Sequence, residues 1–234
     1  MSTDQKISVI SIIIPTLNAA SRLEETLASV KGVPGVELLL VDGGSRDETI
    51  AIAHAQGVRV LVSEPGRGRQ MNVGAAAAQG DILLFLHGDT VLPPKFADLV
   101  RETMADPQVA VGAFRLAFER PTAALRGIAW GANLRSRWLR MPYGDQALFL
   151  RREFFAATGG FAELPLLEDV VLVRSLKRKG RIVTRPETVV TSAVRWRQSG
   201  CLRQTARNQL ILLGFFLGVP FERLALWYGL GEKG

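Results

Sequence analysis

The sequence has little of what disulfide-stabilised and zinc-binding proteins depend on. It contains one cysteine, Cys201, and two histidines among 234 residues. A single cysteine cannot form an intramolecular disulfide, and no Cys/His cluster has the spacing of a structural zinc site. These absences point to a reducing compartment, and we predict a cytoplasmic protein.

Long apolar runs and a secretory signal are also missing. The N-terminal stretch MSTDQKISVISIIIP lacks a basic segment, a longer apolar core and a small-residue cleavage site, and its apolar part ends at Pro15. The C-terminal apolar stretch around 210–221 is interrupted by Gly214, Gly218 and Pro220, so about 20 consecutive apolar residues are not available to span a membrane. Two interpretations of this stretch stay open: a packed core helix or homodimer face, and an amphipathic helix lying peripherally on the inner face of the membrane.

Acidic residues are outnumbered by basic ones. The chain has 29 Lys and Arg against 22 Asp and Glu, with a net charge of +7. Such an excess favours anionic partners such as phosphates, although a solvated basic surface explains it equally. No RNP-type aromatic motif, zinc finger or basic helix-turn-helix is present, so we predict no nucleic-acid partner.

The apolar pattern predicts strands and helices in alternation, which is typical of right-handed crossovers and a mostly parallel sheet. In the first half we expect strands at 7–14, 36–42, 58–63 and 81–87, and helices at 21–31, 45–56 and 69–79. Ser45 and Glu48 have the spacing of a capping box at the start of the second helix. In the second half we expect helices at 93–104, 121–140 and 168–179, strands at 109–118, 145–152 and 181–191, and a helical tail at 201–230.

Polar residues follow two of these strands directly. Asp42 ends one strand, and His87 and Asp89 follow the apolar run ILLFL. In open α/β sheets, ligands bind at the carboxyl ends of the strands. Asp42 can accept hydrogen bonds from a base or ribose, or cap a turn. Asp89 can bind Mg²⁺ or Mn²⁺ together with a diphosphate, whereas His87 is a metal or nucleotide ligand or a hydrogen-bonded core histidine.

Two further segments carry candidate chemistry. The Gly- and Arg-rich loop EPGRGRQMNVGA runs into a helix, where N–H groups and guanidinium groups can hold phosphate; a flexible basic loop is the alternative. Met71 stands where a dinucleotide fingerprint needs a small residue, which argues against an NAD-dependent oxidoreductase. Glu168 and Asp169 lie at a helix start, where a negative charge is stabilised, and either carboxylate can also serve as a general base.

Taken together, these residues resemble the inverting nucleotide-sugar glycosyltransferases of glycosyltransferase family 2. The resemblance covers about residues 7–197 and depends on the order of IIIPTLN, LLVDGGSRDET, GRGRQMNVGA, ILLFLHGDT and LLEDVVL. It is greatest for a small bacterial branch with a histidine in the acidic motif. It implies the GT-A fold, a three-layer α/β sandwich with a mostly parallel central sheet. We expect one domain over 1–234, with a nucleotide-binding half (1–92), an acceptor half (93–200) and a C-terminal helical tail (201–234).

The resemblance also implies roles for individual residues. The nucleotide-sugar donor would contact Pro15, Thr16, Asn18, Asp42, Gly68, Arg69, Gln70, Asn72, His87, Gly88 and Asp89. Asp89, together with His87, would bind Mn²⁺ or Mg²⁺. Asp169 would be the catalytic base, with Glu168 beside it in the Glu-Asp pair. The acceptor and leaving group would contact Asp145, Gln146, Arg195 and Trp196.

Three positions depart from the family pattern. His87 replaces the first aspartate of the Asp-x-Asp motif, which leaves the metal one carboxylate short. Ala19 stands where family members often carry glutamate, so one ribose contact is absent. Ser192 stands where the processive motif has glutamine. We therefore predict transfer of a single sugar rather than polymerisation.

The predicted function is metal-assisted transfer of one sugar, with inversion, from a nucleotide-diphosphate sugar to an acceptor hydroxyl, with a UDP-sugar favoured. A nucleotide-sugar-binding or nucleotidylyltransferase-like protein without sugar transfer is the alternative, although PTLNAASR lacks the glycines of a nucleotidylyltransferase loop. An arginine-rich segment next to Asp145 and Gln146 favours an anionic acceptor, and a lipid-linked acceptor stays open. Its arginines are Arg126, Arg135, Arg137 and Arg140.

Overall fold

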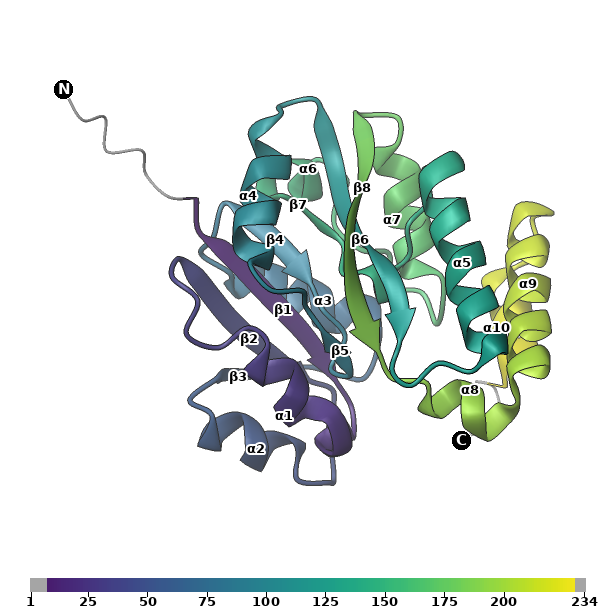
Figure 1. Ribbon diagram of the computed structural model, residues 1–234, viewed down its shortest axis with the longest axis horizontal. Helices are drawn as coiled ribbons and strands as arrows, with labels where there is room; N and C mark the ends of the chain where they lie inside the picture. The colour runs from purple at the N-terminus through teal and green to yellow at the C-terminus, as the bar shows by residue number, and fades with distance from the viewer. Residues whose placement is uncertain (1–7, 230–234) are drawn as a thin grey trace.

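A computed structural model describes residues 8–229, apart from the side chains of residues 195, 198 and 199. Within these residues one sheet of eight strands runs through the molecule in the order β3-β2-β1-β4-β7-β6-β8-β5 (Figure 1). The strands are β1 (Ile10–Thr16), β2 (Val36–Asp42), β3 (Arg59–Val62), β4 (Ile82–Phe85), β5 (Thr90–Val91), β6 (Val109–Phe118), β7 (Phe149–Arg151) and β8 (Arg181–Thr191).

Helices cover both faces of this sheet (Figure 1). They are α1 (Ala20–Ala28), α2 (Thr49–Ala55), α3 (Arg67–Ala77), α4 (Phe96–Ala105), α5 (Ala123–Trp138), α6 (Arg152–Ala156), α7 (Glu168–Leu176), α8 (Val194–Ser199), α9 (Cys201–Phe216) and α10 (Phe221–Tyr228), with a 3₁₀ turn η1 (Gly144–Gln146). Residues from α1, α2, α4 and α5 share one buried core with Ile12 and Ile14, whereas those from α3, α6 and α7 share another with Ile13. This alternation along β1 confirms the predicted three-layer sandwich.

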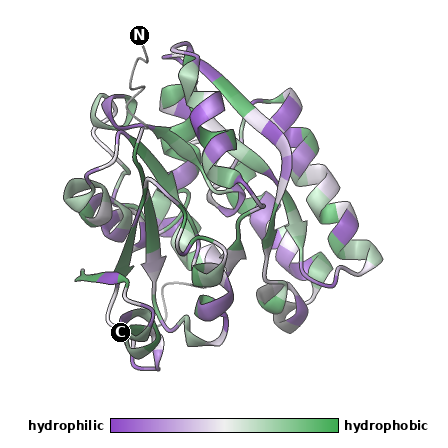
Figure 2. Cartoon of the chain, turned by 60° about the vertical axis from the view of Figure 1, so that its left-hand side comes forward, coloured by the Kyte–Doolittle hydropathy of each residue, from purple (hydrophilic) through white to green (hydrophobic). Residues whose placement is uncertain are grey.

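β1, β4 and most of β6 are buried on both sides and are therefore almost continuously apolar, whereas β3 and most of β8 are partly or fully exposed (Figure 2). β3, β2, β1 and β4 are parallel to one another, as predicted, and β6 is parallel to β8. β7 is antiparallel to both β4 and β6. The sheet is therefore mixed at its centre, with the parallel strands of the N-terminal half on one side.

Two of the differences from the predicted elements have a clear physical reason. The second helix begins at Thr49 rather than at residue 45, because the Ser45 hydroxyl donates to Asp42 Oδ1 at 2.5 Å and accepts from the Asn18 N–H at 2.8 Å instead of capping a helix. The expected strand over 145–152 is reduced to β7, since Gln146 is fully buried and donates from Nε2 to the Phe114 carbonyl at 2.9 Å. η1 precedes β7, and α6 follows it.

The C-terminal tail forms two packed helices rather than one. The chain turns between α9 and α10 at Gly218, whose φ is +79°, and Pro220 precedes the first residue of α10. Gly214 lets the two helices approach, since a Cβ there would lie 2.7 Å from Leu224 Cδ2. No helix in the described part of the chain is long and apolar enough to cross a membrane.

Candidate active site

The loops after β1 and β2 are hydrogen-bonded to each other at the carboxyl edge of the sheet. Asp42 is buried, and its carboxylate accepts from the Gly44 and Ser45 N–H groups at 2.8 Å each and from Thr16 Oγ1 at 3.3 Å. The Asn18 side chain accepts from the Arg46 N–H at 2.9 Å. These bonds fix the shape of the two loops. The loops contain the residues that were expected to contact the nucleotide-sugar donor: Pro15, Thr16, Asn18 and Asp42. They also occupy the Asp42 carboxylate, which was expected to contact a base.

Gln70 attaches the start of α3 to the same edge. Its buried amide donates to the Thr16 carbonyl at 2.7 Å and to the Val41 carbonyl at 2.8 Å. A Cβ on Gly43 would lie 3.0 Å from Gln70 Nε2, so the loop after β2 passes directly over this amide. The Gly- and Arg-rich loop therefore lies next to the ends of β1 and β2, as a phosphate loop must.

Asn72, also expected at the diphosphate, has a structural partner instead. Its amide pairs with both the N–H and the carbonyl of Phe161, at 2.9 and 2.8 Å. A Cβ on Gly68 would lie 2.6 Å from the Ala162 carbonyl oxygen, so only glycine allows this approach. Both contacts hold the segment before α7 against α3, which places the Glu168–Asp169 pair next to the basic loop.

Two arginines of this loop have different acidic partners. Arg69 forms an exposed ion pair with Glu163 at 2.9 Å, whereas Arg67 Nη1 lies 3.2 Å from Glu168 Oε1. Glu168 is buried, and burial raises its pKa; the charge of Arg67 acts in the opposite direction, and that of Asp169 raises the pKa further. Glu168 is thus engaged by a guanidinium group. The alternating Gly-Arg pattern indicated the loop but not which arginine pairs with Glu168.

His87 and Asp169 meet at one backbone position, Gly144. The Gly144 N–H donates to Asp169 Oδ2 at 2.6 Å, and a Cβ added to Gly144 would lie 3.1 Å from His87 Nε2 and 3.2 Å from Asp169 Oδ2. The Val170 N–H donates to the other oxygen of Asp169 at 2.8 Å. These bonds fix the orientation of the carboxylate at the start of α7. The sequence contains YGDQ but gave no sign that its glycine separates these two side chains.

Asp89 lies two residues after His87 and is partly buried. Its carbonyl accepts from the Ser192 N–H at 3.1 Å, and Thr90 Oγ1 is 3.4 Å from its carboxylate. A Cβ on the intervening Gly88 would lie 3.2 Å from Thr16 Cγ2, so the His-Gly-Asp segment packs against the end of β1. β5, which follows at once, pairs with the end of β8 and holds this segment in place.

The fit of these residues to a divalent cation is partial. Among residues 8–229, no three His, Cys, Asp or Glu side chains converge in a way that would hold a metal ion. The carboxylate of Asp89 is the hard oxygen ligand that Mn²⁺ and Mg²⁺ prefer, and His87 offers one imidazole. The residues fit a cation that takes its remaining ligands from a bound diphosphate.

Asp145, one residue beyond Gly144, is an unusual acid. Its Oδ1 is buried without a hydrogen-bond partner. Burial raises the pKa of Asp145 from 3.8 to about 6, partly offset by the charge of Arg135 and increased by that of Asp169. The Arg135 guanidinium stacks 3.4 Å from the centre of the Tyr143 ring. This side of the site therefore carries an acid that titrates close to neutral pH.

The raised pKa of Asp145 predicts a pH-dependent stability. The folded chain binds this proton more tightly than the unfolded chain, so the free energy of unfolding falls as the pH rises from about 4 to about 6, by the order of 1–3 kcal/mol. Asp145→Asn should flatten this part of the profile in urea unfolding at several pH values. Glu168 acts in the same direction, so a smaller slope should remain. If the free energy of unfolding of the variant depended on pH as strongly as that of the wild type, the raised pKa would not belong to Asp145.

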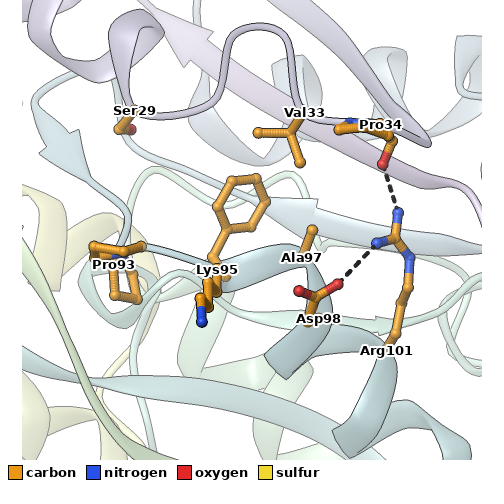
Figure 3. A pocket seen from close by; sticks show the side chains of 10 residues that line it. Ser29, Val33, Pro34, Pro93, Lys95, Ala97, Asp98 and Arg101 are labelled. Carbon is orange, nitrogen blue, oxygen red and sulfur yellow. Dashed lines mark hydrogen bonds and ion pairs between the residues drawn. The ribbon is translucent and has the colours of Figure 1, made fainter.

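Two cavities lie near the sheet. One of about 380 Å³ is bordered by Pro34, Pro93 and Arg101, and Arg101 donates to the Pro34 carbonyl at 2.9 Å (Figure 3). Pro34 precedes β2, so this cavity lies at the amino ends of the strands, away from Asp42 and Asp89. The other, of about 780 Å³, lies between α5 and α9 and reaches Tyr143 and Asp145.

Only some of the expected acceptor residues line the larger cavity. Asp145, Trp196 and Arg135 line it, and Trp196 also packs edge-on against Phe118 at 5.7 Å. Gln146 is instead buried beneath it. The remaining arginines of the 121–140 segment, Arg126, Arg137 and Arg140, are exposed and are not among its lining residues. The side chain of Arg195 lies outside the described residues.

Comparison with known proteins adds independent observations. The chain is 33% identical over 170 residues to the PGL/p-HBAD biosynthesis glycosyltransferase of Mycobacterium bovis (strain BCG / Pasteur 1173P2), which covers 64% of this chain and 62% of that protein. The chain spans between 30% and 62% of the length of the curated relatives that it matches.

Solved structures share the fold. The S. aureus TarS 1–349 structure in complex with UDP-GlcNAc superposes with a TM-score of 0.63 at 18% identity, covering 79% of this chain and 58% of that one. Glucosyl-3-phosphoglycerate synthase from Mycobacterium tuberculosis, in complex with Mn²⁺, UDP-glucose and phosphoglyceric acid, superposes with a TM-score of 0.56 at 23% identity. The superposition covers 79% of this chain and 70% of that one. The predicted GT-A fold is thereby confirmed. Residues 11–163 match the model of glycosyl transferase family 2, and the chain belongs to that family.

Proposed function

We propose that this protein transfers one sugar from a UDP-sugar to an acceptor hydroxyl, with inversion at the anomeric carbon. The observation that carries the proposal is the meeting of His87 and Asp169 at Gly144, with Asp89 two residues along the same loop. The closeness of an expected cation ligand, His87, and the candidate base, Asp169, to the same glycine supports the proposal. The UDP-GlcNAc and UDP-glucose in the two related structures support the choice of UDP-sugar.

On the donor side, the nucleotide would lie over the joined loops after β1 and β2. Asp42 shapes the base pocket through its bonds to Gly44 and Ser45 rather than through a free carboxylate. The diphosphate would lie near the start of α3, where Arg67 adds a positive charge held in place by Glu168. Gln70 and Asn72 position this loop, and Arg69 contributes to the basic rim.

Asp89 and His87 would hold the divalent cation that the Mn²⁺ complex of a related enzyme suggests. Such a cation supplies electrostatic stabilisation of the negative charge that develops on the leaving diphosphate. Because the chain offers one carboxylate here, we expect the cation to bind tightly only together with the nucleotide.

Asp169 would accept the proton of the acceptor hydroxyl as the hydroxyl oxygen attacks. Its two oxygens each accept one backbone N–H, from Gly144 and Val170, which fixes its direction while leaving lone pairs for a proton. Glu168 is paired with Arg67 and acts as a positioning residue. The displacement is a single step on the face opposite the diphosphate, and it gives inversion.

Slow hydrolysis of the donor provides a direct test. The protein, incubated with Mn²⁺ and a panel of UDP- and GDP-sugars, should release nucleoside diphosphate from one UDP-sugar without an added acceptor, because water can replace the hydroxyl. Nucleotide release can be followed by a coupled assay. Tight binding of UDP-sugars without any release, even with a broad acceptor mixture, would favour a binding protein instead, and release only from GDP-sugars would overturn the choice of base.

A further inference from the structure

The cavity between α5 and α9 is mostly apolar although the surrounding segment is rich in arginine. Its volume of about 780 Å³ lies within the range of about 300–1,000 Å³ typical of small-molecule sites. Its walls and mouth are formed largely by hydrocarbon side chains: Leu116, Ile128, Leu139, Met141, Leu202, Leu212, Leu213 and Phe216. Several of them are exposed, with Leu202 at 86% and Phe216 at 57%. Apolar groups open to water in a concave site favour an apolar occupant.

The α5 wall of this cavity is built from small residues. Gly127 and Gly131 lie one turn apart on the lining face, and a Cβ on either would meet nothing within 4 Å. Packing therefore does not require glycine at these positions, and two glycines in the middle of a helix reduce its stability. Their effect is to keep the space between α5 and α9 open.

One end of the cavity joins the proposed catalytic site. Tyr143 and Asp145 line it, and Gly144 between them donates its N–H to Asp169 at 2.6 Å. Asp145 brings a carboxyl group to this end of the cavity, and its Oδ1 has no hydrogen-bond partner within the protein. The cavity thus has a polar inner end beside the candidate base and an apolar outer part.

From this arrangement we propose that the acceptor is an amphipathic alcohol. Its hydrocarbon part lies in the cavity between α5 and α9, and its hydroxyl reaches Asp169 past Tyr143 and Asp145. The proposal rests on the proposed function and identifies the acceptor class of that site. A membrane lipid and a freely dissolved amphiphile share this chemistry, and the two sources are separated experimentally below.

The single cysteine offers a measurement that needs no enzymatic activity. Cys201 lines the cavity and is partly buried. Butyl, hexyl and octyl β-D-glucoside, each below its micelle concentration, should slow alkylation of Cys201 by iodoacetamide. The half-protecting concentration should fall by up to about fourfold for each added methylene, because each buries more hydrocarbon. Vesicles of phosphatidylglycerol form a second arm beside the glucosides. Stronger protection by the vesicles than by octyl glucoside at the same amphiphile concentration indicates a membrane lipid, and weaker protection by the vesicles indicates a soluble amphiphile.

Variants of α5 provide the matched controls. Gly131→Leu fills the cavity and should reduce the protection at least about tenfold, whereas Gly131→Ala should change it little. Ala123→Leu adds the same side chain to an exposed position of α5 that is not among the lining residues, and should leave protection unchanged. Since Ala123 and Gly131 are exposed and a Cβ at Gly131 would meet nothing within 4 Å, circular dichroism should show intact folding; if Gly131→Leu fails to fold, Gly127→Leu takes its place.

The outcomes separate this inference from the proposed function. Protection of Cys201 that does not depend on the alkyl length of the glucoside would overturn the assignment of the cavity as the acceptor site. Protection that survives in a folded Gly131→Leu or Gly127→Leu variant would overturn it as well. Suppose that protection of Cys201 depends on the alkyl length of the glucoside but the protein never releases UDP. The apolar site would then be supported and the sugar transfer rejected. With both present, the octyl glucoside should also accelerate UDP release in the wild type more than in Gly131→Leu.

Discussion

Asp169→Asn is expected to reduce sugar transfer by about 10²- to 10⁴-fold while leaving the affinity for the UDP-sugar nearly unchanged. Asparagine keeps the size of aspartate and can still accept the Gly144 N–H, but it cannot take up the acceptor proton. The expected result is a loss of kcat at an almost constant dissociation constant for the donor. Transfer rates and isothermal titration with UDP measure the two quantities separately.

The neighbouring acid gives the control for this experiment. Glu168→Gln removes the negative charge that pairs with Arg67 but not the proposed base, so it should weaken donor binding and lower kcat less than Asp169→Asn does. If Asp169→Asn instead abolished donor binding, or if Glu168→Gln had the larger effect on kcat, Asp169 would be a structural residue and Glu168 the better candidate for the base.

Asp89→Ala is expected to weaken Mn²⁺-dependent binding of UDP on the order of 10- to 100-fold, equivalent to about 1.4–2.8 kcal/mol. The reason is that Asp89 is the one carboxylate that the His-Gly-Asp segment offers, and the carboxylate is the hard ligand of the pair. Titration of UDP in the presence of Mn²⁺ and again with a chelator measures the metal-dependent part of the affinity.

A second aspartate on the same strand provides the comparison. Asp81 lies just before β4, at the opposite end from Asp89, and is exposed. Asp81→Ala should leave the titration as it is in the wild type. An Asp89→Ala variant that binds UDP with unaltered Mn²⁺ dependence would remove Asp89 from the metal site.

The sequence predicted β1 to β4 closely, because β1, β4 and the end of β2 are buried apolar runs bounded by turn residues. It was less successful where side chains serve the tertiary structure. Ser45 has the spacing of a helix cap, yet its hydroxyl bonds to Asp42 and Asn18. Gln146 lies in a stretch that looks like a strand, yet its buried amide holds a 3₁₀ turn beneath the cavity.

In the candidate site, too, some features could be predicted from the sequence and others depend on tertiary contacts. Order and spacing of the motifs identified the family, and the family model matches residues 11–163. They could not distinguish Arg67 from Arg69, since both follow a glycine in the same loop and only the tertiary structure brings Glu168 next to Arg67. Nor could they indicate that the expected anionic acceptor pocket would be lined largely by hydrocarbon.

By itself, the sequence determined the α/β layering and the approximate ends of the strands other than β5, because burial and strand period act locally along the chain. Only the tertiary structure decided that Gly144 would lie between His87 and Asp169, and that α9 would close a cavity against α5. These contacts are between residues separated by many positions in the chain. Their distances follow from how layers pack, a property that no short segment encodes.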